Sequence, residues 1–140
     1  MIAQLNPRLS RAVLAAALLM SMAASQAQAD DKGVSILEPK NGATVTSPFK
    51  VKFGVKGMTV HPANELIEGT GHHHLLINHG PIKEGEPIPM DDTHLHYGKG
   101  QTEAEVTLPP GKYTLTAQFA NGVHQSYGPA MAKTISITVK

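Results

Sequence analysis

The sequence predicts an all-β protein, an immunoglobulin-like antiparallel β-sandwich that follows a cleaved signal peptide. Three observations predict it. Apolar and polar residues alternate in several short runs, turn-forming pairs separate these runs, and no helical periodicity of useful length occurs after the N-terminal segment. Alternation gives each strand one face toward a core and one toward solvent, which is the pattern of a two-sheet sandwich.

The N-terminal segment has the three parts of a secretory signal. Arg8 and Arg11 form a short basic region, an apolar run covers residues 12–20, and Ala27-Gln28-Ala29 is a small-x-small cleavage site. The run is shorter than the roughly 20 apolar residues that span a bilayer. We therefore expect residues 1–29 to be removed and residues 30–140 to form one periplasmic or, alternatively, secreted domain.

The remaining chain divides into strands and turns. The alternating runs predict strands at Val34–Leu37, Phe49–Val55, Gly71–Asn78, Glu103–Leu108, Lys112–Phe119 and Thr134–Val139, with shorter pieces near Thr44, Thr93–Tyr97 and Val123–Tyr127. Asn41-Gly42, Pro109-Pro110-Gly111 and Asn121-Gly122 are turn signals between them. Prolines and glycines predict a long loop at residues 79–92. The stretch from Ile36 to Pro48 resembles the first strands of many bacterial immunoglobulin-like modules.

Composition excludes several classes of function. Two of the 12 basic residues lie in the signal peptide, so the rest of the chain is nearly neutral against 11 acidic residues. It has no basic stripe, and we expect no nucleic-acid partner. It has no later apolar stretch long enough for a membrane span. The chain has no cysteine, so thiolate ligands and cysteine nucleophiles are excluded.

Eight histidines are clustered after the signal peptide. Three are consecutive at residues 72–74, and two form the His94-Leu95-His96 pattern. Side chains of a strand alternate between its faces, so His72 and His74 share one face, and so do His94 and His96. Neutral imidazole is a common ligand for zinc and copper. If these strands are neighbours, His72, His74, His94 and His96 form a site for a copper or zinc ion.

The other histidines receive separate predictions. His124 is a candidate fifth ligand, but a two-residue hairpin at Asn121-Gly122 would pair it with Phe119 and place it on the core side, near the rim of the sandwich. His73 lies two and four residues before Leu75 and Ile77, so its side chain shares their face of the strand. We therefore expect it to be half-buried and bonded to the backbone. For His61 and His79, both near turns, we expect solvated or capping roles.

A second interpretation stays open. The chain would be a non-metal interaction module that binds a protein or a cell-envelope polymer through the histidine strand and the loop at residues 79–92. Its histidines would then be structural or pH-sensing, near their ordinary pKa of about 6.5. No Gly-x-Ser-x-Gly, phosphate loop or His-Glu-x-x-His occurs, so we expect no enzyme. Met58, Met90 and Met131 are dispersed and are expected to fill gaps or lie in loops.

Three motifs in order carry a resemblance to a known family. They are the segments 71–78 (GHHHLLIN), 94–104 (HLHYGKGQTEA) and 108–115 (LPPGKYTL). Over about residues 55–139 the chain resembles the bacterial "domain of unknown function 4399" family of small exported proteins. The resemblance implies that the family's histidines and glutamine fall on His72, His73, His74, His94, His96, Gln101 and His124. It implies no settled activity. After His124 the chain reads QSYGP, where many relatives carry further histidines and acids.

Overall fold

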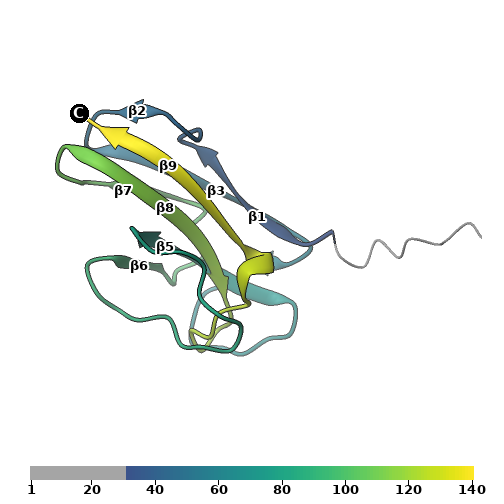
Figure 1. The fold of residues 1–140 in the computed structure, drawn as a ribbon. Helices are drawn as coiled ribbons and strands as arrows, with labels where there is room; N and C mark the ends of the chain where they lie inside the picture. Colours follow the sequence, from purple (N-terminus) through teal and green to yellow (C-terminus); the bar gives the residue numbers. More distant parts are fainter. Residues whose placement is uncertain (1–30) are drawn as a thin grey trace, which may run out of the picture.

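The computed structural model describes residues 31–140, which fold into two packed β-sheets (Figure 1). The signal peptide and its cleavage site, predicted within residues 1–29, lie outside the described residues. The smaller sheet has the order β1-β3-β7, with β1 at Gly33–Glu38, β3 at Phe49–Lys56 and β7 at Glu103–Val106. Its strands are antiparallel, and their alternating apolar residues were the clearest signal in the sequence.

The larger sheet has the order β2-β9-β8-β5-β4, and β6 also pairs with β5. Its strands are β2 (Thr44–Val45), β4 (Thr59–Val60), β5 (Thr70–Ile77), β6 (His94–Tyr97), β8 (Gly111–Ala120) and β9 (Ala132–Val139); a 3-10 turn, η2 (Pro129–Met131), precedes β9. The two long strands β8 and β9 run side by side along the whole sheet (Figure 1).

The core lies between the two sheets. Phe49, Val51 and Phe53 of β3 pack toward alternate residues of the larger sheet, among them Leu75 and Leu115. Val51, Leu75 and Leu115 are completely buried. This packing confirms the predicted all-β sandwich. No helix among residues 31–140 is long and apolar enough to cross a membrane.

The structure corrects three details of the predicted strands. The pairs β2–β9 and β4–β5 are parallel, and β4 was not predicted because two residues are too few to show alternation. Residues 123–127 form isolated bridges instead of a strand. The strand pieces near Thr44 and at Thr93–Tyr97 are present as β2 and β6.

The outer face of β5 and β8 is covered, although alternation predicted a face in solvent. The loop at residues 79–92 folds back across it, and the Ile82 amide donates to Gln118 Oε1 (3.0 Å). Ile88 of this loop is buried with Leu76 and Ala120. As a result, every residue from Gly71 to Ile77 is buried. The loop therefore creates a second, smaller buried region on the outer face of this sheet.

Candidate metal centre

The centre begins with two histidines on the covered face of β5. His72 and His74 are two residues apart in the strand, so their side chains project to the same side, and both are completely buried. His74 lies opposite His96 of β6 and opposite Gln118 of β8. The predicted adjacency of the two His-x-His strands is therefore present, and it brings His96 to His74 and His72.

His124 joins this group by a route that the sequence did not predict. Ala120 bridges to Ser126 instead of Val123, so the chain between them is a wider loop and the predicted two-residue hairpin is wrong. The Asn121 side chain accepts hydrogen bonds from the amides of Val123 and Gln125, both at 3.0 Å. His124 adopts a left-handed backbone conformation (φ 65°). This conformation lets its ring lie beside His72 on the outer face, not the core side.

The four rings converge on a small space. His72 Nε2 lies 2.9 Å from His74 Nε2, 3.2 Å from His96 Nε2 and 3.2 Å from His124 Nδ1. Each residue offers one ring nitrogen, and these four atoms lie within 4.8 Å of one another. Four histidines therefore lie close enough to hold a metal ion.

Hydrogen bonding alone does not satisfy this arrangement. The Nε2 of a neutral imidazole carries either one proton or one lone pair. It cannot form three good hydrogen bonds at once, yet His72 Nε2 has three nitrogen neighbours within 3.2 Å. A cation between the rings would accept all four lone pairs and remove the conflict.

Burial keeps these rings neutral. Loss of solvent, with smaller contributions from His96, His124 and His73, lowers the pKa of His72 to about 4. Burial first, and then the neighbouring His72, His96, His124 and His73, lower the pKa of His74 to about 2, and burial and His124 lower the pKa of His96. A neutral ring keeps the lone pair that a metal needs. At neutral pH these three rings are therefore in the ligand form.

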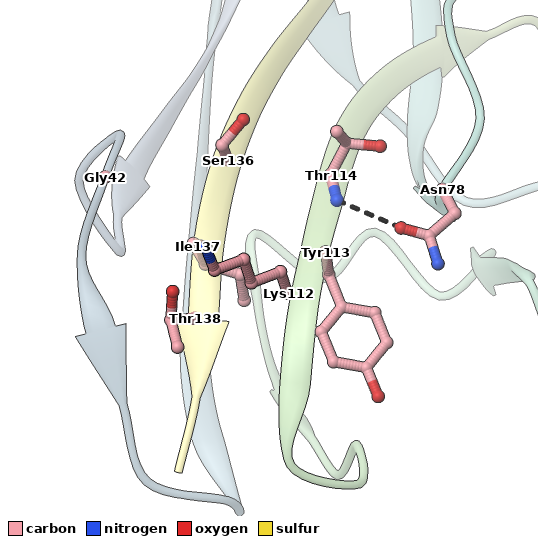
Figure 2. A pocket seen from close by; sticks show the side chains of 8 residues that line it. All are labelled: Gly42, Asn78, Lys112, Tyr113, Thr114, Ser136, Ile137 and Thr138. Atoms are coloured by element: carbon pink, nitrogen blue, oxygen red, sulfur yellow. Dashed lines mark hydrogen bonds between the residues drawn. The ribbon is translucent and has the colours of Figure 1, made fainter.

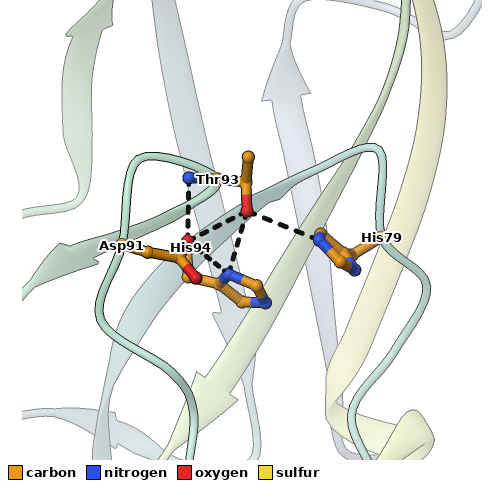
Figure 3. A network of polar contacts seen from close by, with 4 residues as sticks. All are labelled: His79, Asp91, Thr93 and His94. Atoms are coloured by element: carbon orange, nitrogen blue, oxygen red, sulfur yellow. Dashed lines mark hydrogen bonds and ion pairs between the residues drawn. The ribbon is translucent and has the colours of Figure 1, made fainter.

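His94, the remaining predicted ligand, is held away from the cluster. It lies opposite Leu76, two residue pairs along β5 and β6 from the His74–His96 pair. Its Nδ1 is 2.7 Å from Asp91 Oδ1, and Thr93 Oγ1 lies between Asp91, His94 and His79 (Figure 3). Hydrogen bonds from His94 and Thr93 lower the pKa of Asp91 to about 2. The structure thus gives His94 a carboxylate partner and does not bring it into the four-histidine group.

His73 lies on the opposite face from the cluster, in the core of the sandwich. Its ring stacks on Phe53 at a centroid distance of 4.7 Å and meets Phe119 edge-on at 5.0 Å. The ring is completely buried, and neither nitrogen has a hydrogen-bond partner among the described residues. The face on which the His73 side chain lies was predicted correctly. The predicted half-burial and backbone bond are wrong, because aromatic rings enclose the His73 ring on the core side.

The other predicted candidates lie outside the cluster. His61 Nδ1 contacts the Pro62 carbonyl (2.9 Å), and the exposed His79 lies beside Thr93 and the His94 ring. Gln101 Oε1 accepts from the Lys99 amide (2.7 Å) and shapes a turn. Met131 is buried in the core, while Met90 is exposed.

Two surface hollows of the described residues are lined by no histidine. The hollow in Figure 2, about 370 Å³, lies over β8 and β9 near Asn78, whose Oδ1 accepts from the Thr114 amide. A second, about 460 Å³, lies beside Met58, Tyr127 and Met131. In the four-histidine group, His72 and His74 are buried, and His96 and His124 are partly buried.

One short segment fastens the three histidine-bearing parts of the chain together. Residues 61–64, here called the strap, donate backbone hydrogen bonds from His61 to the Gly71 carbonyl, from Ala63 to Gly98 and from Asn64 to Gly122, each 2.8 Å long. These glycines lie within two residues of His72, His96 and His124 respectively. Sequence reasoning missed the strap, although a glycine beside each histidine was a visible signal.

None of these three glycines has room for a side chain. A Cβ at Gly71 would collide with the Ala120 carbonyl oxygen, one at Gly98 with the His96 ring, and one at Gly122 with the Glu65 backbone. Glycine therefore allows the His96 ring to pack against its own chain and the His124 loop to pack against the segment that follows the strap.

With the fold and the histidine geometry established, comparison with known proteins assigns a family. The profile described as "Domain of unknown function (DUF4399)" matches residues 51–140. The chain belongs to this family. The match confirms the resemblance seen in the sequence, and the DUF4399 region contains all four histidines of the cluster.

Two further comparisons add little to the DUF4399 assignment. No protein with a curated description matches the chain. Among solved structures, the endo-beta-1,4-mannanase from Thermotoga petrophila is similar, with 11% identity and a TM-score of 0.45. The alignment covers 78% of this chain and 20% of the mannanase chain, and no activity follows from it.

Proposed function

We propose that this protein is an exported module that holds a transition-metal ion, copper or zinc, through His72, His74, His96 and His124. Export rests on the predicted signal peptide at residues 1–29. The observation that supports metal binding is the meeting of three ring nitrogens on His72 Nε2, at 2.9, 3.2 and 3.2 Å. Bringing four imidazole nitrogens together without a shared cation leaves lone pairs facing one another.

The donor set agrees with this proposal. Imidazole nitrogen suits both zinc and copper, and the lowered pKa values of His72, His74 and His96 keep protons from competing at neutral pH. The proposed role is binding and not catalysis, because four histidine donors fill a four-coordinate ion and leave no open position for a substrate.

Calorimetric titration of residues 30–140 with Zn(II) and Cu(II) tests the proposal. The protein should be purified without a histidine tag, and its metal content should be measured first. We expect one ion per chain, with an affinity that falls about 100-fold in His72→Ala, the variant that removes the shared nitrogen.

Two further variants control this experiment. His124→Ala removes a ligand from a partly exposed loop, so loss of binding there is not a loss of folding. His79→Ala removes an exposed histidine outside the cluster and should leave the affinity unchanged. Binding no tighter than that of free imidazole, or equal binding when all four ligands are alanine, would overturn the proposal in favour of a non-metal interaction module.

A further inference from the structure

We infer that the four-histidine centre is shaped for a tetrahedral ion, and that its metal is zinc(II) and not nickel(II) or square-planar copper(II). This inference rests on the proposed function and specifies its metal. It depends on how the four rings are arranged in space, which the number and type of ligands alone do not fix.

The first observation concerns the nitrogen atoms around His72. With metal–nitrogen bonds of about 2.0–2.1 Å, a tetrahedron separates all ligand nitrogens by about 3.3–3.4 Å, whereas a square places one of each nitrogen's three neighbours at about 4 Å. His72 Nε2 has its three neighbours at 2.9, 3.2 and 3.2 Å. No corner of a square has three short neighbours, so the nitrogens do not form a square around an ion; the other three nitrogen separations are no longer than 4.8 Å.

The second observation concerns the ring centroids. Four imidazoles bound tetrahedrally would have all six centroid separations near about 5 Å, whereas a square would split them into four shorter and two much longer distances. The separations from His72 are 4.7, 4.9 and 5.1 Å to His74, His96 and His124. Those of His96 from His74 and His124 are 5.0 and 4.7 Å, and His74–His124 is 6.0 Å. Five of the six distances agree with a tetrahedron that is opened along one edge.

The third observation is that the rings cannot easily flatten into a plane. His72 and His74 are completely buried on a strand with β8 along one edge and β6 along the other. Gln118, opposite His74, donates to the carbonyls of Phe119, Gly128 and Met131 and accepts from Ile82. A planar ion would have to move at least one of these completely buried rings within its packed surroundings.

The coordination geometry that each metal ion prefers decides which ion fits this arrangement of four nitrogens. Zinc(II) has a filled d shell and accepts a tetrahedron without penalty, whereas copper(II) and nickel(II) favour square-planar or tetragonal nitrogen sites. Copper(I) also accepts a tetrahedron, but it prefers sulfur ligands. All four donors of this centre are nitrogen atoms.

Cobalt(II) substitution tests the geometry by a readout that is independent of affinity. Four-coordinate tetrahedral cobalt gives intense visible absorption, and six-coordinate cobalt gives weak absorption. We expect the intense spectrum, and we expect added zinc to abolish it one ion for one. Competition titrations should show nickel(II) bound at least about tenfold more weakly than zinc(II).

Controls separate the geometry from metal binding itself. His79→Ala should keep the intense cobalt spectrum, and His124→Ala should change it, because that variant removes a ligand from an exposed loop. A weak, six-coordinate cobalt spectrum, or nickel(II) or copper(I) bound more tightly than zinc(II), would overturn the tetrahedral zinc inference while leaving metal binding intact. Absence of binding by every ion would overturn the proposed function as well.

Discussion

His73 shows how two neighbouring residues of one type can have unrelated roles. It sits between His72 and His74 in sequence, yet its ring is stacked on Phe53 in the apolar core, with no hydrogen-bond partner for either nitrogen among the described residues. A buried polar ring without partners costs stability. Burial lowers the pKa of His73 to about 4, so the ring stays neutral in the folded protein.

This buried ring predicts that acid destabilises the metal-free protein. The folded pKa of His73 is below the unfolded value of 6.5, so the unfolded chain binds the proton more readily. Stability is therefore complete above pH 6.5 and is lost as the pH falls toward 4. We expect His73 alone to remove about 2 kcal/mol of unfolding free energy between pH 7.5 and pH 5. Urea denaturation at the two pH values measures this loss.

His73→Leu tests the assignment of that loss to a single ring. Leucine is apolar and similar in volume to histidine, so it should fill the same space without unpartnered nitrogens. We expect the difference in unfolding free energy between pH 7.5 and pH 5 to shrink by about 2 kcal/mol in metal-free protein. An unchanged difference would show that His73 does not carry the acid sensitivity. Zinc binding at neutral pH should persist, because His73 faces away from the cluster.

The strap, residues 61–64, joins the segments that carry the clustered histidines. Its backbone amides donate to the carbonyls of Gly71, Gly98 and Gly122, so the three parts of the chain that carry the clustered histidines are joined by backbone contacts. The His124 loop is also fixed by the amide of Ile88, which donates to the His124 carbonyl (2.9 Å). The ligand positions are thus set by backbone contacts.

Gly122→Ala tests whether the packing around the strap places His124. The new methyl group would collide with the Glu65 backbone, so the loop at residues 121–125 must shift. We expect zinc affinity to fall about tenfold and the unfolding free energy to fall by about 1–3 kcal/mol. Gly80→Ala is the matched control, because nothing lies within 4 Å of its Cβ position. Equal zinc affinity in both variants would contradict a positioning role for Gly122.

The elements differ in how far the sequence determined them. Alternation located β3, β8 and β9 within about two residues, since each buries one face in the main core. It failed on the outer face of β5 and β8, because burial there depends on a loop distant in sequence. His124 was assigned to the wrong face for a related reason: the Asn121 side chain stabilises a wider loop than the Asn-Gly pair alone predicts.

Metal binding at the proposed centre should be coupled to folding of the domain, so that each stabilises the other. The ligands come from β5, β6 and the loop before η2, so an ion bound by all four requires the folded arrangement. A ligand that binds only the folded state at 100 times its dissociation constant adds about 2.7 kcal/mol to the unfolding free energy. Urea denaturation with and without zinc should show this gain, and His124→Ala should reduce it. A gain of the same size in His124→Ala would contradict the four-ligand arrangement.

The contact between His72 and His124 has a further consequence for this cysteine-free chain. The two residues are 52 positions apart in sequence, and their ring nitrogens lie 3.2 Å apart. An ion held by both would act as a reversible cross-link that closes a loop of that length. Closing a loop of this size in the unfolded chain costs about 4 kcal/mol of chain entropy. Metal binding would thus restrain this domain in the way that a disulfide restrains others, and it would do so without cysteine and without oxidation.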